Sequence, residues 1–151
     1  MVSRGSSDGR TRGRSQRGVT LVEVLVTVVV LSFGLLGLAG LQLGALRNNQ
    51  SALERSLAVV ESYSIVDAMR VDRVNAINGA FDLALADAPA GATFADNELI
   101  KWRARLANAL GPTATGAVDC NGADCTIIVQ WNDERGLGGE SAQQIATQVQ
   151  L

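Results

Sequence analysis

The sequence predicts an α+β fold in which a long N-terminal helix packs on a small antiparallel β-sheet. Three features of the 151 residues lead to this prediction: an apolar run near the start, helix-like spacing of apolar residues after it, and strand-like alternation towards the end. At this length we expect one domain, here with an appendage. The predicted segments are residues 1–18, 19–46, 47–78 and 79–151.

The net charge of −2 is a cancellation between segments of opposite charge. Residues 1–18 carry five arginines and one acid, Asp8, whereas residues 47–151 carry a net charge of −5. The first segment is rich in Gly, Ser and Arg and cannot bury enough apolar surface to order itself. Its arginines could neutralise phosphates, or they could hold this end in the cytoplasm. We favour the second interpretation because the apolar run follows directly, and the acidic remainder argues against binding of nucleic acid.

The apolar run predicts a membrane-spanning helix over residues 19–46. Its core, Val24–Leu46, holds 23 consecutive uncharged residues, which as a helix reach about 35 Å and can cross a bilayer. Its Leu, Val and Phe side chains contribute about −4 to −8 kcal/mol to insertion. An ordinary signal peptide has a shorter apolar core and a small-x-small cleavage site, and no adjacent arginines indicate twin-arginine export. Four glycines favour either close helix packing or local loosening of the helix: Gly34, Gly37, Gly40 and Gly44.

Helical patterning continues through residues 47–78. The apolar positions recur every three or four residues, and charged residues take the other faces. A single helix from Val19 to Ile77 would be about 88 Å long, with Asn78-Gly79 as its end. The first half of this helix suits lipid and the second half suits a protein core. The expected core positions of the second half are Leu53, Leu57, Val60, Tyr63, Val66 and Met69.

The C-terminal head is predicted to contain one short helix. Residues 79–95 are rich in alanine and read as a connection with little regular structure. Asp96 can cap a helix over residues 97–110, which Gly111-Pro112 ends. Trp102 lies on the apolar face of this helix, so we expect it in the core.

The rest of the head alternates apolar and polar residues as β-strands do. Two strands are predicted, over residues 126–131 and 144–151, with a loop between them and a further strand at residues 114–118. Together with the helices, these strands complete the predicted α+β architecture.

The residue types argue against catalysis and against a metal site. The chain has no histidine and two cysteines, so most Ser-His, Cys-His and zinc arrangements are excluded. Cys120 and Cys125 flank a turn sequence, and we expect a disulfide in an oxidising compartment that contributes about 2 kcal/mol. Four acids lack a calcium-binding pattern and are expected to be solvated loop charges: Asp119, Asp124, Asp133 and Glu134. We therefore expect a protein that is not an enzyme and that holds neither cofactor nor metal.

The junction Arg17-Gly18-Val19-Thr20-Leu21-Val22-Glu23, followed by the apolar helix, resembles the leader junction of type IV pilins and pseudopilins. In that family the prepilin peptidase cuts after the glycine, methylates the new N-terminus and encounters a glutamate at the fifth mature position. The resemblance implies processing at Gly18 and Val19 and an assembly or methylation role for Glu23. Major pilins usually have phenylalanine where this chain has Val19. The fold it implies is type IV pilin-like.

A carboxylate at the edge of a lipid-embedded segment is costly and suggests a partner. After cleavage that partner would be the α-amino group of Val19, in the same chain or in a neighbouring subunit. The alternative is that Glu23 only complements the helix dipole. The adjoining Gly18 favours the assembly or processing role.

Two further stretches, Leu35–Gln42 and Asp67–Arg70, resemble the PilV family of minor pilins, the type IV pilus modification proteins. This resemblance implies a bacterial inner-membrane protein with a cytoplasmic leader and a periplasmic head that enters a type IV pilus. The implied partners are the prepilin peptidase, other minor pilins, the major pilin, a tip adhesin and membrane lipid. Two alternatives remain: an I-type pseudopilin of a type II secretion system, and a single-span membrane-anchored binding module.

Overall fold

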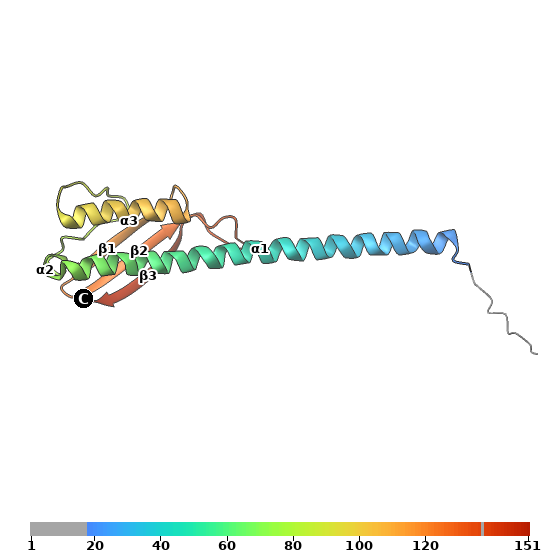
Figure 1. Ribbon diagram of the computed structural model, residues 1–151, viewed down its shortest axis with the longest axis horizontal. Helices are drawn as coiled ribbons and strands as arrows, with labels where there is room; N and C mark the ends of the chain where they lie inside the picture. Colours follow the sequence, from blue (N-terminus) through green and yellow to red (C-terminus); the bar gives the residue numbers. More distant parts are fainter. Residues whose placement is uncertain (1–17, 137) are drawn as a thin grey trace, which may run out of the picture. The chain divides into compact units, whose positions relative to one another are not determined.

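A computed structural model describes residues 18–136 and 138–151 and confirms the predicted α+β class (Figure 1). The chain divides into two compact units, one that ends at Gly40 and one that covers Leu41–Leu151. The second unit holds a three-stranded antiparallel sheet in the order β1-β2-β3. The elements are α1 (Leu21–Val71), α2 (Arg73–Ala76), α3 (Phe94–Leu110), β1 (Thr115–Asn121), β2 (Asp124–Trp131) and β3 (Gln143–Gln150).

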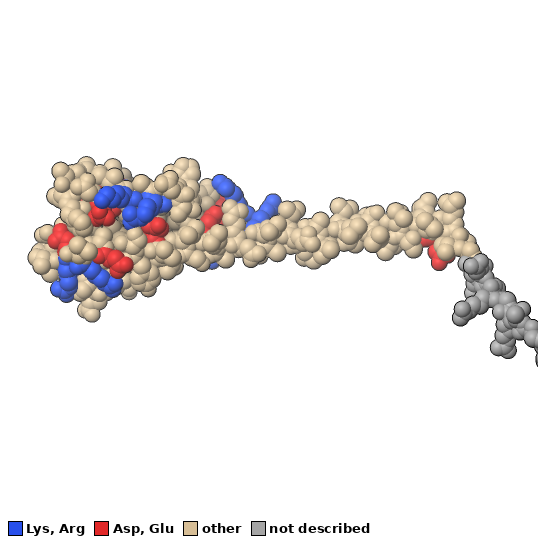
Figure 2. Space-filling model, viewed as in Figure 1, with Lys and Arg blue, Asp and Glu red and all other residues tan. Residues whose placement is uncertain are grey.

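The first part of α1 is a continuous apolar helix. It runs without interruption through the four glycines between residues 34 and 44. Apart from one acidic group near its start, this part of α1 carries no charged side chain, whereas charges gather over the second unit (Figure 2). The first half of the helix therefore has the surface that lipid or other helices require.

The prediction of one helix up to Ile77 was wrong, because α1 ends at Val71. Asp72 has φ −118° and ψ 50°, which breaks the helix before the single turn of α2. The Asp72 carboxylate accepts from the side-chain amide of Asn75, at 2.8 and 2.9 Å, and this local bond competes with continuation of the helix. Gly79 then adopts φ +82° and turns the chain, as expected for the predicted stop.

The short helix of the head begins earlier than predicted. Helix α3 starts at Phe94, and Thr93 rather than Asp96 is its N-cap. The Asp96 backbone N–H donates to Thr93 Oγ1 at 3.1 Å, and the Thr93 N–H donates to the Asp96 carboxylate at 3.2 Å. This reciprocal capping box satisfies two N–H groups at once, which a cap at Asp96 would not do.

The sheet is an antiparallel meander whose strands are longer or shifted relative to the prediction. Strand β1 extends to Asn121 and β2 begins at Asp124, so that only a two-residue turn, with Gly122 at φ +65°, separates them. Strand β2 alternates fully, with Ile127, Val129 and Trp131 on its buried side. Strand β3 ends at Gln150, where its pairing with β2 ends. The connection before α3 is not wholly irregular, because Leu83 forms an isolated bridge with Val118.

The periodicity predicts only part of the face that the second half of α1 buries: Val66 and Met69 are buried as predicted, and Leu57 is partly buried against the core. Leu53, Val60 and Tyr63 are 59%, 61% and 51% exposed. The buried positions of α1 include two small side chains and continue towards its end: Ala58, Ser62, Ile65, Val66 and Met69. The large Trp102 ring belongs to the same buried core. The small side chains of α1 leave room for this ring, so that it can pack close to the helix.

Candidate functional site

The predicted processing junction lies outside the helix. Gly18, Val19 and Thr20 have no regular secondary structure and are exposed, and α1 begins at Leu21 rather than at Val19. Thr20 explains the later start, because its Oγ1 accepts from the Glu23 backbone N–H at 3.3 Å. The Thr20 carbonyl also accepts the first helical bond, from the Val24 N–H at 3.2 Å. The peptide bond between Gly18 and Val19 is therefore not part of a helix.

Glu23 lies in the first turn of α1 and its side chain is exposed. At this position a carboxylate meets the positive end of the helix dipole. It forms no ion pair with any residue that the structure describes. It is also the only charged residue between Gly18 and Arg47. Within the described part of the chain, a carboxyl group without an ion-pair partner therefore lies at the start of an apolar helix.

The helix that follows Glu23 can cross a membrane by length and composition. Helix α1 is the one candidate span among the described residues, and none of its most apolar 18-residue window is buried. The side chains of this window are exposed although most of them are aliphatic, for example Leu35 at 57% and Leu36 at 69%. A surface of this kind is stable only against lipid or against other apolar helices.

Residues 13–39 match the family model of the prokaryotic N-terminal methylation motif. The match covers Gly18, Val19, Glu23 and most of the first half of α1. The chain carries a type IV pilin-like N-terminal methylation motif. No curated protein and no solved structure matches the chain significantly. The methylation motif implies processing by a prepilin peptidase and pilin-type assembly of a membrane-anchored chain, and it is typical of structural proteins rather than enzymes.

Thr20 lies within the region that matches the methylation motif, and its role as the cap of α1 was not predicted from the sequence. Thr20 and Glu23 have the spacing of a capping signature, a Thr followed three residues later by a Glu at the start of an apolar run. This spacing could have placed the start of the helix at Leu21. The rest of the predicted leader, residues 1–17, lies outside the described residues.

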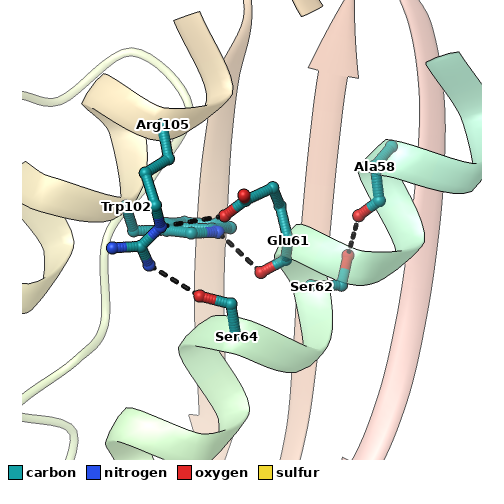
Figure 3. A network of polar contacts seen from close by, with 6 residues as sticks. All are labelled: Ala58, Glu61, Ser62, Ser64, Trp102 and Arg105. Atoms are coloured by element: carbon teal, nitrogen blue, oxygen red, sulfur yellow. Dashed lines mark hydrogen bonds and ion pairs between the residues drawn. The ribbon is translucent and has the colours of Figure 1, made fainter. Parts of the chain in front are cut away.

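In the head, α3 is fixed to α1 by a polar network around Trp102 (Figure 3). Trp102 is fully buried, as predicted, and its Nε1 donates to the Glu61 carbonyl at 2.9 Å. Arg105 donates from Nε to the Glu61 carboxylate at 3.1 Å and from Nη2 to Ser64 Oγ at 2.6 Å. Glu61 thus accepts bonds from α3 through both its backbone and its side chain. The contacts hold the two helices in one register.

Arg103, on the same helix, joins three segments of the head. Its guanidinium donates to the carbonyls of Gly116, Ala84 and Asp87, with distances of 2.7 Å to both Gly116 and Ala84. Desolvation lowers the pKa of Arg103 from its usual value, and the negative charge of Asp87 opposes this shift. The side chain therefore ties the connection before α3 to strand β1.

Cys120 and Cys125 form a disulfide between directly paired residues of β1 and β2, with their Cα atoms 4.1 Å apart.

The prediction that Asp133 is a solvated loop charge was wrong. Asp133 is 2% exposed and accepts from Ser51 Oγ at 2.5 Å, with Arg55 Nη2 at 3.9 Å. Among the residues that the structure describes, no three histidine, cysteine or acidic side chains gather as a metal site.

Proposed function

We propose that this chain is a non-catalytic minor pilin that a prepilin peptidase cuts after Gly18 and that enters a type IV pilus through α1. The match of residues 13–39 to the N-terminal methylation motif carries this proposal. The geometry of the junction is consistent with it, since Gly18 and Val19 precede the helix and are exposed. Before cleavage the arginine-rich leader keeps its end in the cytoplasm, and the head is then periplasmic.

Glu23 acts in this proposal as the acceptor for a new positive charge. Cleavage after Gly18 creates an α-amino group on Val19, four residues before Glu23. In a surrounding of low dielectric constant a carboxylate and an ammonium group attract strongly, and each offsets the cost of burying the other. If the amino group belongs to a neighbouring subunit, this pairing also sets how far one helix slides along the next. An unpaired Glu23 would oppose such packing.

The finer assignment is to the PilV type of minor pilin. Its partners are then other minor pilins, the major pilin and a tip adhesin, and its roles are pilus assembly, adhesion and twitching motility. The two stretches Leu35–Gln42 and Asp67–Arg70 support this branch. The second candidate is an I-type pseudopilin of a type II secretion system, because such proteins carry the same motif. Co-purification with secretion rather than pilus components would favour that candidate.

The processing step is tested by mass spectrometry of the protein isolated from its own membranes. We expect a mature chain that begins at Val19 and carries one added methyl group on its N-terminus. A mature chain with any other first residue would overturn the proposed cleavage after Gly18.

The assembly step is tested by replacing Glu23 with Ala and measuring the protein in sheared filaments and in membranes. We expect the Glu23→Ala chain to remain in membranes but to disappear from filaments. Asp67→Ala is the matched control, since it removes one acid from an exposed position of α1 and should leave incorporation unchanged. Equal incorporation of Glu23→Ala and the control would support an ordinary membrane anchor and not a pilin.

A further inference from the structure

The sequence contains two Asn-Gly pairs, Asn78-Gly79 and Asn121-Gly122. In such a pair the backbone nitrogen of the glycine can attack the side-chain carbonyl carbon of the asparagine, because glycine has no side chain to block the approach. The attack requires a glycine N–H that can lose its proton and an asparagine amide that can rotate. Both asparagines are exposed, so exposure alone does not distinguish the two pairs. Their hydrogen bonds do.

Both reacting groups of the first pair are held by hydrogen bonds. The Asn78 side-chain Nδ2 donates to the Val74 carbonyl at 2.7 Å, and the Gly79 N–H donates to the Ala76 carbonyl at 3.0 Å. A Cβ at Gly79 would also lie 2.7 Å from Asp82 Oδ2, so a carboxylate lies beside this glycine and opposes the loss of its proton. The first pair is therefore protected from the reaction.

Neither reacting group of the second pair is held by a described residue. The pair lies at the turn between β1 and β2, where Gly122 has φ +65° and, apart from its chain neighbours, no atom within 4 Å of the position that a Cβ would take. The Gly122 N–H forms no hydrogen bond with a residue that the structure describes. The Asn121 side chain forms none either, and it lines a hollow of about 550 Å³ on the sheet. Water therefore reaches both groups, and the amide can rotate.

We propose that Asn121 is a site of spontaneous deamidation. The Gly122 nitrogen loses its proton to a base in the solvent and forms a bond with Asn121 Cγ. The bond between Cγ and Nδ2 then breaks, ammonia leaves, and a cyclic succinimide remains. A water molecule opens this ring at either of its carbonyl carbons, which gives aspartate or isoaspartate. No atom is oxidised or reduced in either step.

The reaction gives the exposed turn one more negative charge. Asn121 is paired with Asp124, and Asp119 lies two residues before it on the same strand and the same face. Neither of these acids forms an ion pair with a described residue, so the new carboxylate would face like charge across the strands. Isoaspartate also lengthens the backbone by one carbon. The neighbouring Cys120–Cys125 disulfide ties β1 to β2 and limits this change to the turn.

The test follows both pairs in the full chain, kept folded in detergent at neutral pH. Samples taken over time are digested, and mass spectrometry detects the replacement of the amide by an acid in each peptide. Asn78 reacts only after both of its bonds have opened, so Asn121 should react at least about tenfold faster. Equal rates at the two pairs, a faster reaction of Asn78 or no reaction of Asn121 would overturn the proposal.

The same chain unfolded in guanidinium chloride is the matched control. Without the fold the two pairs should react at similar rates, because both then have free amides and free N–H groups. A difference as large as that in the folded chain would show that the structure is not its cause and would overturn the proposal.

A variant tests the assignment to Asn121 itself. Asn121→Gln keeps the amide but disfavours closure of the ring, which would contain one more carbon. The mass gain in the peptide that contains position 121 should disappear, and the rate at Asn78 should not change. A gain that persists in this peptide would refute the site. These measurements do not depend on where the leader is cut or on filament assembly, so their failure would leave the proposed function untouched.

Discussion

Replacing Gly116 with Ala should destabilise the head by overpacking the contact between β1 and α3. A Cβ at Gly116 would lie 2.2, 2.7 and 2.9 Å from three carbons of the Trp102 ring. The ring cannot move away easily, because its Nε1 is bonded to the Glu61 carbonyl at 2.9 Å and the side chain is fully buried. Inserting a methyl group into such a site costs about 1–3 kcal/mol. For a unit of this size, each kcal/mol lowers Tm by about 4–8 °C.

The assay is thermal unfolding of the full chain in detergent, followed by tryptophan fluorescence. Both tryptophans, Trp102 and Trp131, are buried in the head, so the signal reports on the head and not on the apolar half of α1. The control is Gly116→Ala in a Trp102→Leu background, where Trp131 still reports unfolding and the smaller side chain leaves room for the methyl group. There the substitution should cost less than about 0.5 kcal/mol, a difference that a double-mutant cycle resolves. An equal cost in both backgrounds would refute the steric explanation.

Three further stability predictions use the same unfolding assay. Thr93→Ala removes the cap of α3 and should cost about 1 kcal/mol, with a control at Thr113, which caps no helix; no difference between the two would argue against the capping box. Reduction of the Cys120–Cys125 bond should lower the free energy of unfolding by about 2 kcal/mol, and the double serine variant should no longer respond to reductant. Ser51→Ala leaves the buried Asp133 carboxylate with one bond fewer and should cost about 1–3 kcal/mol, whereas Ser56→Ala, at an exposed position, should cost little.

The architecture could be predicted because its main signals are local. A long uncharged apolar run, followed by helical spacing and then by strict alternation, leaves few folds open. The boundaries were less accurate for reasons that are also local. Thr20 and Thr93 cap helices through side-chain bonds to residues three positions later, and both were overlooked in favour of other starts. At Asp72 a bond to Asn75 interrupts a helix that apolar spacing alone would continue.

Contacts between distant segments could not be predicted from the same signals. Asp133 looks like a loop acid in the sequence, whereas in the structure it is buried and accepts from Ser51, 82 positions away. The contacts of Arg103 and Asp82 with the backbone of β1 likewise have no signature in the sequence. By contrast, Gly18, Val19 and Glu23 could be singled out from the sequence because they belong to one short motif.

The prediction of the buried face of α1 was correct for Val66 and Met69 and wrong for other positions, such as Leu53 and Val60, for a physical reason that bears on function. Apolar residues recur on every helix face that becomes covered, whether the chain itself or a neighbouring subunit covers it. The periodicity alone does not distinguish these faces. The chain itself covers the face with Ala58 and Ser62, where small side chains allow Trp102 to reach the helix backbone. The chain leaves Leu53 and Val60 more than half exposed. These two residues lie on one of the more apolar faces of α1. A soluble monomer gains nothing from that pattern, but a subunit whose helix packs among other helices does, which is the behaviour that the methylation motif implies for this chain.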